Sequence, residues 1–141
     1  MILLVDDDPL QAELMQEACE QIGVPFDLVA VKDGVEAMKY LRREGPYSGA
    51  KRPSFVFLDL NMPRKDGRQV LAEMKEDPDL KNIPVSILST SSSEEEIGQA
   101  YLLHANCYLT KPRTMDGLVE MIKDVNKFWF GTACLPSSTS S

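Results

Sequence analysis

Five short apolar runs alternate along the 141-residue chain with longer stretches of helical character. This alternation is typical of a parallel β-sheet whose two faces are covered by helices. Of the two common doubly wound arrangements, the shorter one has the strand order 2-1-3-4-5. We therefore predict an α/β fold with five parallel strands in that order and five helices. The apolar runs lie at residues 2–5, 26–31, 55–58, 85–88 and 107–109.

Helix-start signals follow several of these runs. Asp8 is followed by Pro9, which predicts an N-cap and a first helical position after the first strand. Asp33 is the expected N-cap of the second helix, and Ser93 with Glu96 has the pattern of a capping box for the fourth. The expected helices cover residues 10–22, 33–43, 67–76, a segment after residue 93, and residues 114–128.

Composition excludes several classes of protein. The formal net charge of -7 argues against nucleic acid binding, because that affinity depends on Lys and Arg contacts to phosphates. No apolar stretch approaches the roughly 20 residues of a membrane helix, and the N-terminus lacks a signal-peptide pattern. We therefore expect a cytoplasmic protein with no membrane partner. The three cysteines are far apart and odd in number, which predicts neither a disulfide framework nor a zinc site.

Acidic residues stand at the ends of two predicted strands. Asp6 and Asp7 follow the first strand, and Asp59 follows the third. In a flavodoxin-like sheet, ligands bind outside the carboxyl ends of the strands, where the winding reverses between these two strands. Carboxylates about 4 Å apart repel by about 4 kcal/mol at the effective dielectric of a protein site, so a positive charge is needed among them. Lys111, after the fifth strand, and a hard cation such as Mg²⁺ are the candidates.

Asp59 is also a candidate nucleophile, because aspartate carboxylates form covalent bonds with phosphoryl groups. A cation beside it would shield the phosphoryl oxygens and hold the group in line. An aspartate-nucleophile phosphatase shares this pattern, but Asn61 stands where that class needs an acid to shuttle protons. A flavodoxin-like module would bind a flavin at the same edge, where the acids would repel the phosphate of the cofactor.

Four segments, "LLVDDDP", "FVFLDLNMPRKDG", "IPVSILSTS" and "CYLTKP", occur in this order along the chain. Together they resemble the receiver domain of two-component response regulators, over residues 1–128. The resemblance implies that Asp59 accepts a phosphoryl group from the phosphohistidine of a sensor histidine kinase. It also implies an Mg²⁺ or Mn²⁺ site, with Asp7 and Asp59 as direct ligands, the Asn61 backbone carbonyl as a further ligand, and Asp6 bound through water.

The same resemblance assigns roles to three further residues. Lys111 would pair with the phosphoryl oxygens, and the Lys111–Pro112 bond would be cis. Ser89 would supply the hydroxyl that moves onto the phosphoryl group, and Tyr108 would turn inward as that hydroxyl moves. Such a protein promotes its own phosphorylation and dephosphorylation and is not an enzyme acting on a separate substrate.

A narrower resemblance rests on "REGPYSGAKRPS", "LHANCYLTKP" and "FWFGTACLP". These segments are similar to those of the small regulators that partner bacterial phytochromes, which are light-sensing histidine kinases. The kinase partner expected from this resemblance is a phytochrome.

Apolar residues continue beyond the predicted fifth helix, and a Ser-rich end follows them. We therefore divide the chain into a receiver domain, 1–128, and a C-terminal extension, 129–141. An exposed aromatic tail would form an apolar patch, which is typical of a partner surface. We predict that residues 128–136 pack across a two-fold homodimer, since closed two-fold dimers are the commonest oligomers. The dozen residues after the fifth helix are too few for an output domain, so we expect the protein to act by changing a protein contact or by passing the phosphoryl group onward.

Overall fold

A computed structural model describes residues 1–136 of the chain. Its centre is a five-stranded, all-parallel sheet in the order β2-β1-β3-β4-β5, which confirms the predicted fold class and strand order. The strands are β1 (Ile2–Val5), β2 (Leu28–Val31), β3 (Phe55–Leu58), β4 (Val85–Ser89) and β5 (Cys107–Thr110).

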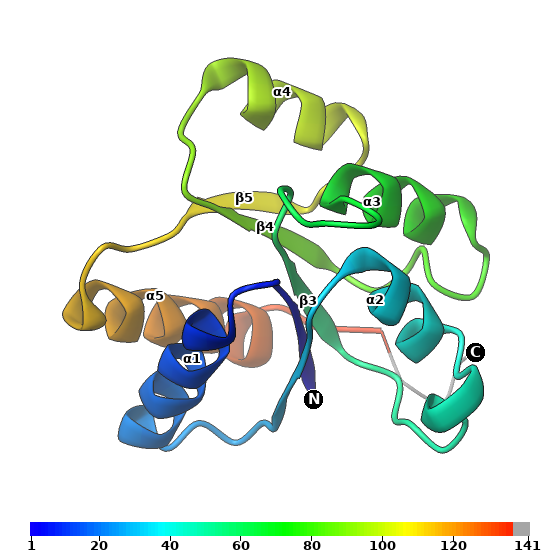
Figure 1. Cartoon of the computed structure of the whole chain (residues 1–141). Coiled ribbons are helices and arrows are strands. Elements are labelled where there is room, and N and C mark those ends of the chain that lie inside the picture. The colour runs from blue at the N-terminus through cyan, green and yellow to red at the C-terminus, as the bar shows by residue number, and fades with distance from the viewer. Residues whose placement is uncertain (137–141) are drawn as a thin grey trace.

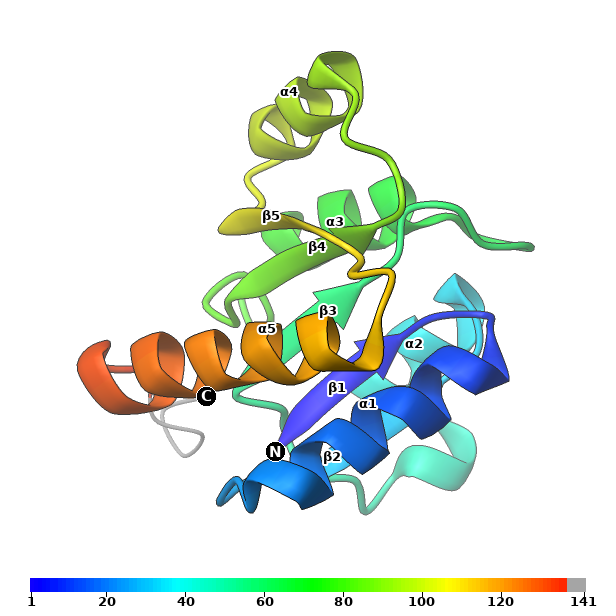
Figure 2. The same ribbon diagram turned by 90° about the vertical axis from the view of Figure 1, so that its left-hand side faces the viewer.

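Helices cover both faces of the sheet. In Figures 1 and 2, α1 and α5 lie side by side on one face, and α2, α3 and α4 lie on the other. None of the helices within residues 1–136 combines the length and the apolar character needed to cross a membrane. The helices are α1 (Pro9–Ile22), α2 (Gly34–Leu41), α3 (Gly67–Glu76), α4 (Glu94–Leu102) and α5 (Met115–Lys127), with a 3₁₀ turn η1 (Gly45–Tyr47) and a π-helical turn η2 (Phe128–Thr132).

Strand β1 shows why the apolar runs are continuous. Successive side chains of a strand point to opposite faces, and here both faces are covered by helices. Leu3 and Val5 therefore join the core beneath α2, α3 and α4, while Ile2 and Leu4 join the core beneath α1 and α5. All four side chains are fully buried, so we expect polar residues only after the strand has left the sheet.

The second strand is shorter than predicted. It begins at Leu28, which pairs with Ile2, so that Phe26 precedes the strand. The ring of Phe26 stacks on Phe130 with the ring centroids 4.9 Å apart. The apolar character of Phe26 was therefore a poor guide to strand pairing, because its ring contacts Phe130 near the far end of the chain.

The aromatic segment after α5 packs partly on the protein itself. Trp129 and Phe130 contact Phe55 of β3, with centroid distances of 5.3 and 6.2 Å. Both rings are therefore only partly exposed, as the helical spacing predicted for Trp129, because they pack against the core beneath α1 and α5. Phe128 remains 54% exposed. The rest of the Ser-rich tail, residues 137–141, lies outside the described residues.

Two of the three cap predictions hold. Asp8 Oδ1 accepts from the Leu10 N–H at the start of α1, and Asp33 Oδ1 accepts from the Glu36 N–H at the start of α2. The capping box predicted for α4 is only half formed. Ser93 Oγ accepts from the Glu96 N–H, but the Glu96 carboxylate bonds to an arginine of α3 instead of returning to the backbone. A complete capping box occurs at α3, between Asp66 and Gln69.

Candidate functional site

The three predicted acids meet at the carboxyl edge of the sheet. Asp6 and Asp7 directly follow β1, and Asp59 directly follows β3. These strands are neighbours, with Val5 opposite Leu58 at their ends. One carboxylate oxygen from each acid lies within 4.8 Å of the other two, an arrangement able to hold a metal ion. Asp6 and Asp59 are buried, whereas Asp7 is exposed to solvent.

Lys111 supplies a positive charge to this cluster. It follows β5, and its backbone N–H donates to the Ser89 carbonyl at the end of β4. Its Nζ lies 2.8 Å from Asp6 Oδ2 and 3.6 Å from Asp59 Oδ2. The side chain is 13% exposed, so solvent screens these ion pairs weakly. The structure therefore brings together all four charged residues that the sequence placed at this edge.

The electrostatics of the site are uneven. Burial raises the pKa of Asp59, and the charges of Asp6 and Asp7 raise it further, while Lys111 and the Asn61 N–H oppose the rise. The net result is a pKa above the ordinary aspartate value. Burial alone would lower the pKa of Lys111, but its contacts with Asp6 and Asp59 outweigh burial and raise it. Lys111 is therefore cationic. The positive charge around Asp59 is too small to offset burial and the repulsion from the neighbouring acids.

The turn after Asp59 is tightly built. Asp59 Oδ1 accepts from the backbone N–H of Asn61 at 3.2 Å, and the Gly67 N–H donates to the Leu60 carbonyl at 2.9 Å. A Cβ at residue 67 would lie 2.2 Å from the Asp59 carbonyl oxygen, so only glycine permits this close return of the chain. Asn61 is thereby held beside the acid cluster, where its backbone carbonyl was predicted to be a metal ligand.

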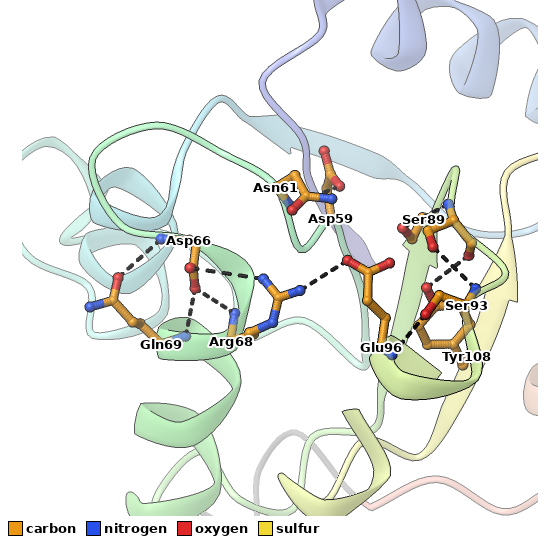
Figure 3. Close-up of polar contacts among 10 residues, drawn as sticks. Asp59, Asn61, Asp66, Arg68, Gln69, Ser89, Ser93, Glu96 and Tyr108 are labelled. Atoms are coloured by element: carbon orange, nitrogen blue, oxygen red, sulfur yellow. Dashed lines mark hydrogen bonds and ion pairs between the residues drawn. The ribbon is translucent and has the colours of Figure 1, made fainter. Parts of the chain in front are cut away.

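The two predicted switch residues lie on neighbouring strands, β4 and β5. Ser89 is completely buried, and its Oγ accepts from the Ser91 N–H at 3.2 Å. The Tyr108 hydroxyl donates to the Ser91 carbonyl at 2.8 Å, and its half-buried ring packs on the core beneath α2, α3 and α4. Figure 3 shows Ser89 and Tyr108 close together beside the start of α4. Both side chains are thus bonded to the same residue of the loop leading into that helix.

One predicted feature is wrong. Residues 1–136 contain no cis peptide bond, so Lys111–Pro112 is trans. The trans form of an X–Pro bond is favoured by about 0.5–1 kcal/mol. With the trans bond, the Lys111 Nζ reaches both Asp6 and Asp59, so these ion pairs do not require the cis form.

Sequence reasoning missed two ion pairs around the site. Arg64 bonds to Asp33, and Arg68 bonds to Glu96 at 3.0 Å. Figure 3 shows the second pair spanning from α3 to α4. This contact matters because α4 buries only Ala100 against the protein. Each pair joins residues about 30 positions apart, so no local pattern reveals it. The only signal was the presence of two arginines without an assigned role, Arg64 in the turn after Asp59 and Arg68 at the start of α3.

The model of the response regulator receiver domain family matches residues 2–123. This chain is a receiver domain. The response regulator Rcp1 of Synechocystis sp. is 44% identical over 138 residues, which cover 98% of this chain and 94% of Rcp1. Its Mn²⁺-bound crystal structure has a TM-score of 0.88, with coverage of 96% of this chain and 98% of that one.

Two further solved structures are similar. The phosphorylated cyanobacterial phytochrome response regulator RcpA is 51% identical, with a TM-score of 0.90 and coverage of 96% of this chain and 97% of that one. The response regulator RPA3017 in red light signalling of R. palustris is 34% identical, with a TM-score of 0.90 and coverage of 96% and 98%.

Membership of the receiver domain family decides between the phosphoacceptor, phosphatase and flavin-binding interpretations of the sequence. Receiver domains are phosphoacceptors that work with sensor histidine kinases, and neither the phosphatase nor the flavin-binding module is favoured. The acid cluster of this receiver domain and the Mn²⁺-bound relative both agree with a divalent metal ion.

Proposed function

We propose that this receiver domain accepts a phosphoryl group on Asp59 from the phosphohistidine of a phytochrome sensor kinase. The observation that carries the proposal is the convergence of Asp6, Asp7, Asp59 and Lys111 at one edge of the sheet. The choice of kinase is supported by the similarity to RcpA, which is a cyanobacterial phytochrome response regulator, and to a regulator in red light signalling.

The proposed transfer exchanges one bond of phosphorus for another. A carboxylate oxygen of Asp59 attacks the phosphorus, a P–O bond forms, and the P–N bond to the kinase histidine breaks. The electron pair of that bond stays on the imidazole nitrogen, which takes up a proton from water. We propose that the Lys111 ammonium binds a phosphoryl oxygen, a role supported by its distance of 3.6 Å from Asp59 Oδ2.

The residues present fit a hard divalent cation. The oxygens of Asp6, Asp7 and Asp59 cluster within 4.8 Å, and Asp7 is open to solvent. We propose that Asp7, Asp59 and the Asn61 carbonyl bind Mg²⁺ or Mn²⁺ directly and that Asp6, already paired with Lys111, contributes through water. When bound, such an ion neutralises charge on the transferring group and keeps it in line.

Phosphorylation would change the surface through Ser89 and Tyr108. It adds about 1.5 to 2 negative charges at Asp59, which attract the Ser89 hydroxyl toward the new oxygens. Ser89 Oγ now bonds to Ser91, and Tyr108 bonds to the same residue. Movement of Ser89 therefore alters the loop before α4 and, with it, the surface formed by α4, β5 and α5.

Several finer proposals accompany this one. The protein promotes its own phosphorylation and dephosphorylation, turns over no separate substrate, and works in the cytoplasm. Residues 1–128 form the receiver domain, and residues 129–141 form an extension. A homodimer forms through residues 128–136, supported by the exposed ring of Phe128.

Phosphotransfer from an autophosphorylated phytochrome kinase tests the central proposal. We expect one phosphoryl group per chain, formed only when Mg²⁺ is present and none in Asp59→Asn. The extent should follow the light state of the kinase. Label on Asp59→Asn would refute the assignment of the acceptor, and indifference to light would refute the kinase. Continuous hydrolysis of a phosphate ester would support a phosphatase instead.

Light scattering at high micromolar concentration tests the dimer. Phe128→Asp should shift the mass from dimer to monomer. Leu102→Asp is a matched control, because Leu102 is 79% exposed on α4 and outside the proposed interface. A monomeric wild-type protein, phosphorylated or not, would contradict the dimer.

A further inference from the structure

The loop between β3 and α3 carries Asn61 and has no regular secondary structure. At its start, the Asn61 N–H is bonded to Asp59, and at its end Asp66 caps α3. Between these points the loop must be held by side chains or by contacts with other elements. Lys65 contacts Glu73 of α3, and Arg64 reaches away from α3 toward α2.

Arg64 is bound firmly to the start of α2. Its Nε and Nη2 both donate to Asp33 Oδ2, at 3.0 and 2.7 Å. Asp33 is only 3% exposed, and its other oxygen caps α2 by accepting from the Glu36 N–H at 2.9 Å. Burial raises the pKa of Asp33, but the hydrogen bonds from Glu36 and Arg64 outweigh burial and leave the pKa below the ordinary value. Asp33 is therefore charged at neutral pH.

The backbone conformation of the loop is consistent with close packing of residues 64–65 against the start of α2. Arg64 has a φ of +64°, a left-handed conformation that a long side chain seldom adopts. The next residue, Lys65, packs so closely on α2 that a Cβ at Gly34 would lie 2.1 Å from its carbonyl oxygen. A strained backbone of this kind persists only where surrounding contacts determine it. The bond from Arg64 to Asp33 is one of those contacts.

The anchor extends beyond Asp33. Arg64 Nη2 lies 3.7 Å from a Glu36 carboxylate oxygen, and the other oxygen of Glu36 accepts from the Tyr47 hydroxyl at 2.8 Å. Arg64 is thus tied to a hydrogen-bonded group that spans α2 and the turn η1. Only Met62 and Pro63 separate Arg64 from Asn61, so few backbone torsions are available to absorb a shift of Arg64 before it reaches Asn61.

We propose that Arg64 is a positioning residue, which holds the Asn61 carbonyl in place for the metal ion by anchoring the loop to Asp33. This inference rests on the proposed function, because it assumes that the acid cluster and Asn61 bind a divalent cation. In this role Arg64 does not itself bind the ion, and its ion pairs are with Asp33 and Glu36 rather than with the acid cluster. It acts through the backbone of Met62 and Pro63.

The sign of the effect separates positioning from simple electrostatics. Arg64 is a cation in the neighbourhood of a proposed cation site. If charge alone mattered, removing it would strengthen metal binding, because repulsion would fall. If Arg64 positions Asn61, removing it weakens binding. Outer residues that orient metal ligands typically change affinity by roughly 10- to 100-fold.

The experiment measures Mn²⁺ affinity by electron paramagnetic resonance of the free ion, together with thermal melting in EDTA. Arg64→Gln should weaken Mn²⁺ binding roughly tenfold, at the low end of the range for such residues. Asp33→Asn keeps an oxygen for capping α2 but loses the charged acceptor, and should also weaken binding. The double variant should bind Mn²⁺ no more weakly than whichever single variant has the lower affinity, because both substitutions break the same contact between Arg64 and Asp33.

Arg42→Gln is the matched control. Arg42 also pairs through its guanidinium with an acid 31 residues away, Glu73, but it lies just after α2, at the end away from the site. The affinity of the Arg42→Gln variant for Mn²⁺ should stay within about twofold of wild type, since surface substitutions are usually nearly neutral. Equal melting temperatures of these variants in EDTA would show that a change in affinity is not a loss of folding.

Different outcomes would contradict the positioning role of Arg64 and the proposed metal site. Equal or tighter Mn²⁺ binding by Arg64→Gln, or additive losses in the double variant, would overturn the positioning role. Failure of the wild-type protein to bind Mn²⁺, or equal binding by Asp59→Asn, would overturn the proposed metal site itself.

Discussion

Replacing Asp59 with asparagine should stabilise the metal-free protein. Asn keeps an oxygen that can accept the Asn61 N–H but removes a buried negative charge. The pKa of Asp59 is raised because burial and the neighbouring acids disfavour its charged form. A group whose charged form is disfavoured by folding makes the native state less stable at neutral pH. Asp59 therefore lowers the free energy of unfolding when no cation is bound.

The distances give the size of the effect. At an effective dielectric of 20, the Lys111 ammonium at 3.6 Å attracts the Asp59 carboxylate by about 5 kcal/mol. At 4.8 Å or less, Asp6 and Asp7 each repel it by about 3.5 kcal/mol or more, although solvent weakens the term from exposed Asp7. The two repulsions in full exceed the attraction by about 2 kcal/mol; solvent around Asp7 lowers this excess and burial of Asp59 adds to it, so we expect a gain of about 1–2 kcal/mol in Asp59→Asn. For a domain of this size that raises the melting temperature by roughly 5 °C.

The assay is thermal melting at pH 7 in EDTA and again with Mg²⁺ in excess. In EDTA, Asp59→Asn should melt above the wild type. With Mg²⁺ at about 100 times its Kd, the wild type should gain about 2.7 kcal/mol and the order should reverse. Asp8→Asn is the control, because Asp8 is an exposed neighbouring acid whose cap asparagine can replace, and it should change stability by less than about 0.5 kcal/mol.

The pH dependence provides a second check. Between the ordinary aspartate pKa and the raised pKa of Asp59, the folded protein binds more protons than the unfolded chain. The stability of the wild type therefore falls as pH rises through this window, while asparagine does not titrate. The stability advantage of Asp59→Asn in EDTA should be absent below this pH range and complete above it. A variant that is less stable than wild type in EDTA at pH 7 would refute this reasoning.

Three other substitutions test the packing and charge of the same protein by chemical denaturation. Lys111→Met should lose about 3–5 kcal/mol in EDTA, because buried Asp6 loses its cationic partner, and an unchanged midpoint would contradict the ion pair. Gly67→Ala should lose about 3 kcal/mol, because its Cβ would collide with the Asp59 carbonyl, whereas near-neutrality would mean that the turn can open. Phe130→Ala should lose about 2 kcal/mol, since its ring covers the core beneath α5, and no loss would mean that the segment is not docked.

The charged site was predictable because it depends on strand ends. Once the apolar runs are strands in the order 2-1-3-4-5, Asp6, Asp59 and Lys111 must emerge at one edge, and the structure places them there. Helix starts at Asp8 and Asp33 were predictable for a similar reason, because a cap acts over three residues. These features are either local or fixed by topology.

The features that could not be predicted are contacts between side chains distant in sequence. Glu96 has the spacing of a capping box, yet its carboxylate bonds to Arg68 because α3 lies within reach of α4. Phe26 was counted in the apolar run of a strand, yet its ring stacks on Phe130 after α5. In each case a local pattern competed with a partner whose proximity only the packed fold creates.

The sparse burial of α4 has a consequence for amide hydrogen exchange. Ala100 is its one buried residue, so opening this helix exposes little apolar surface. Its amides should exchange through local fluctuations long before those of β1 or β3, at a free energy far below that of global unfolding. A segment with so little protection can be ordered or released by the few kcal/mol that one covalent modification supplies.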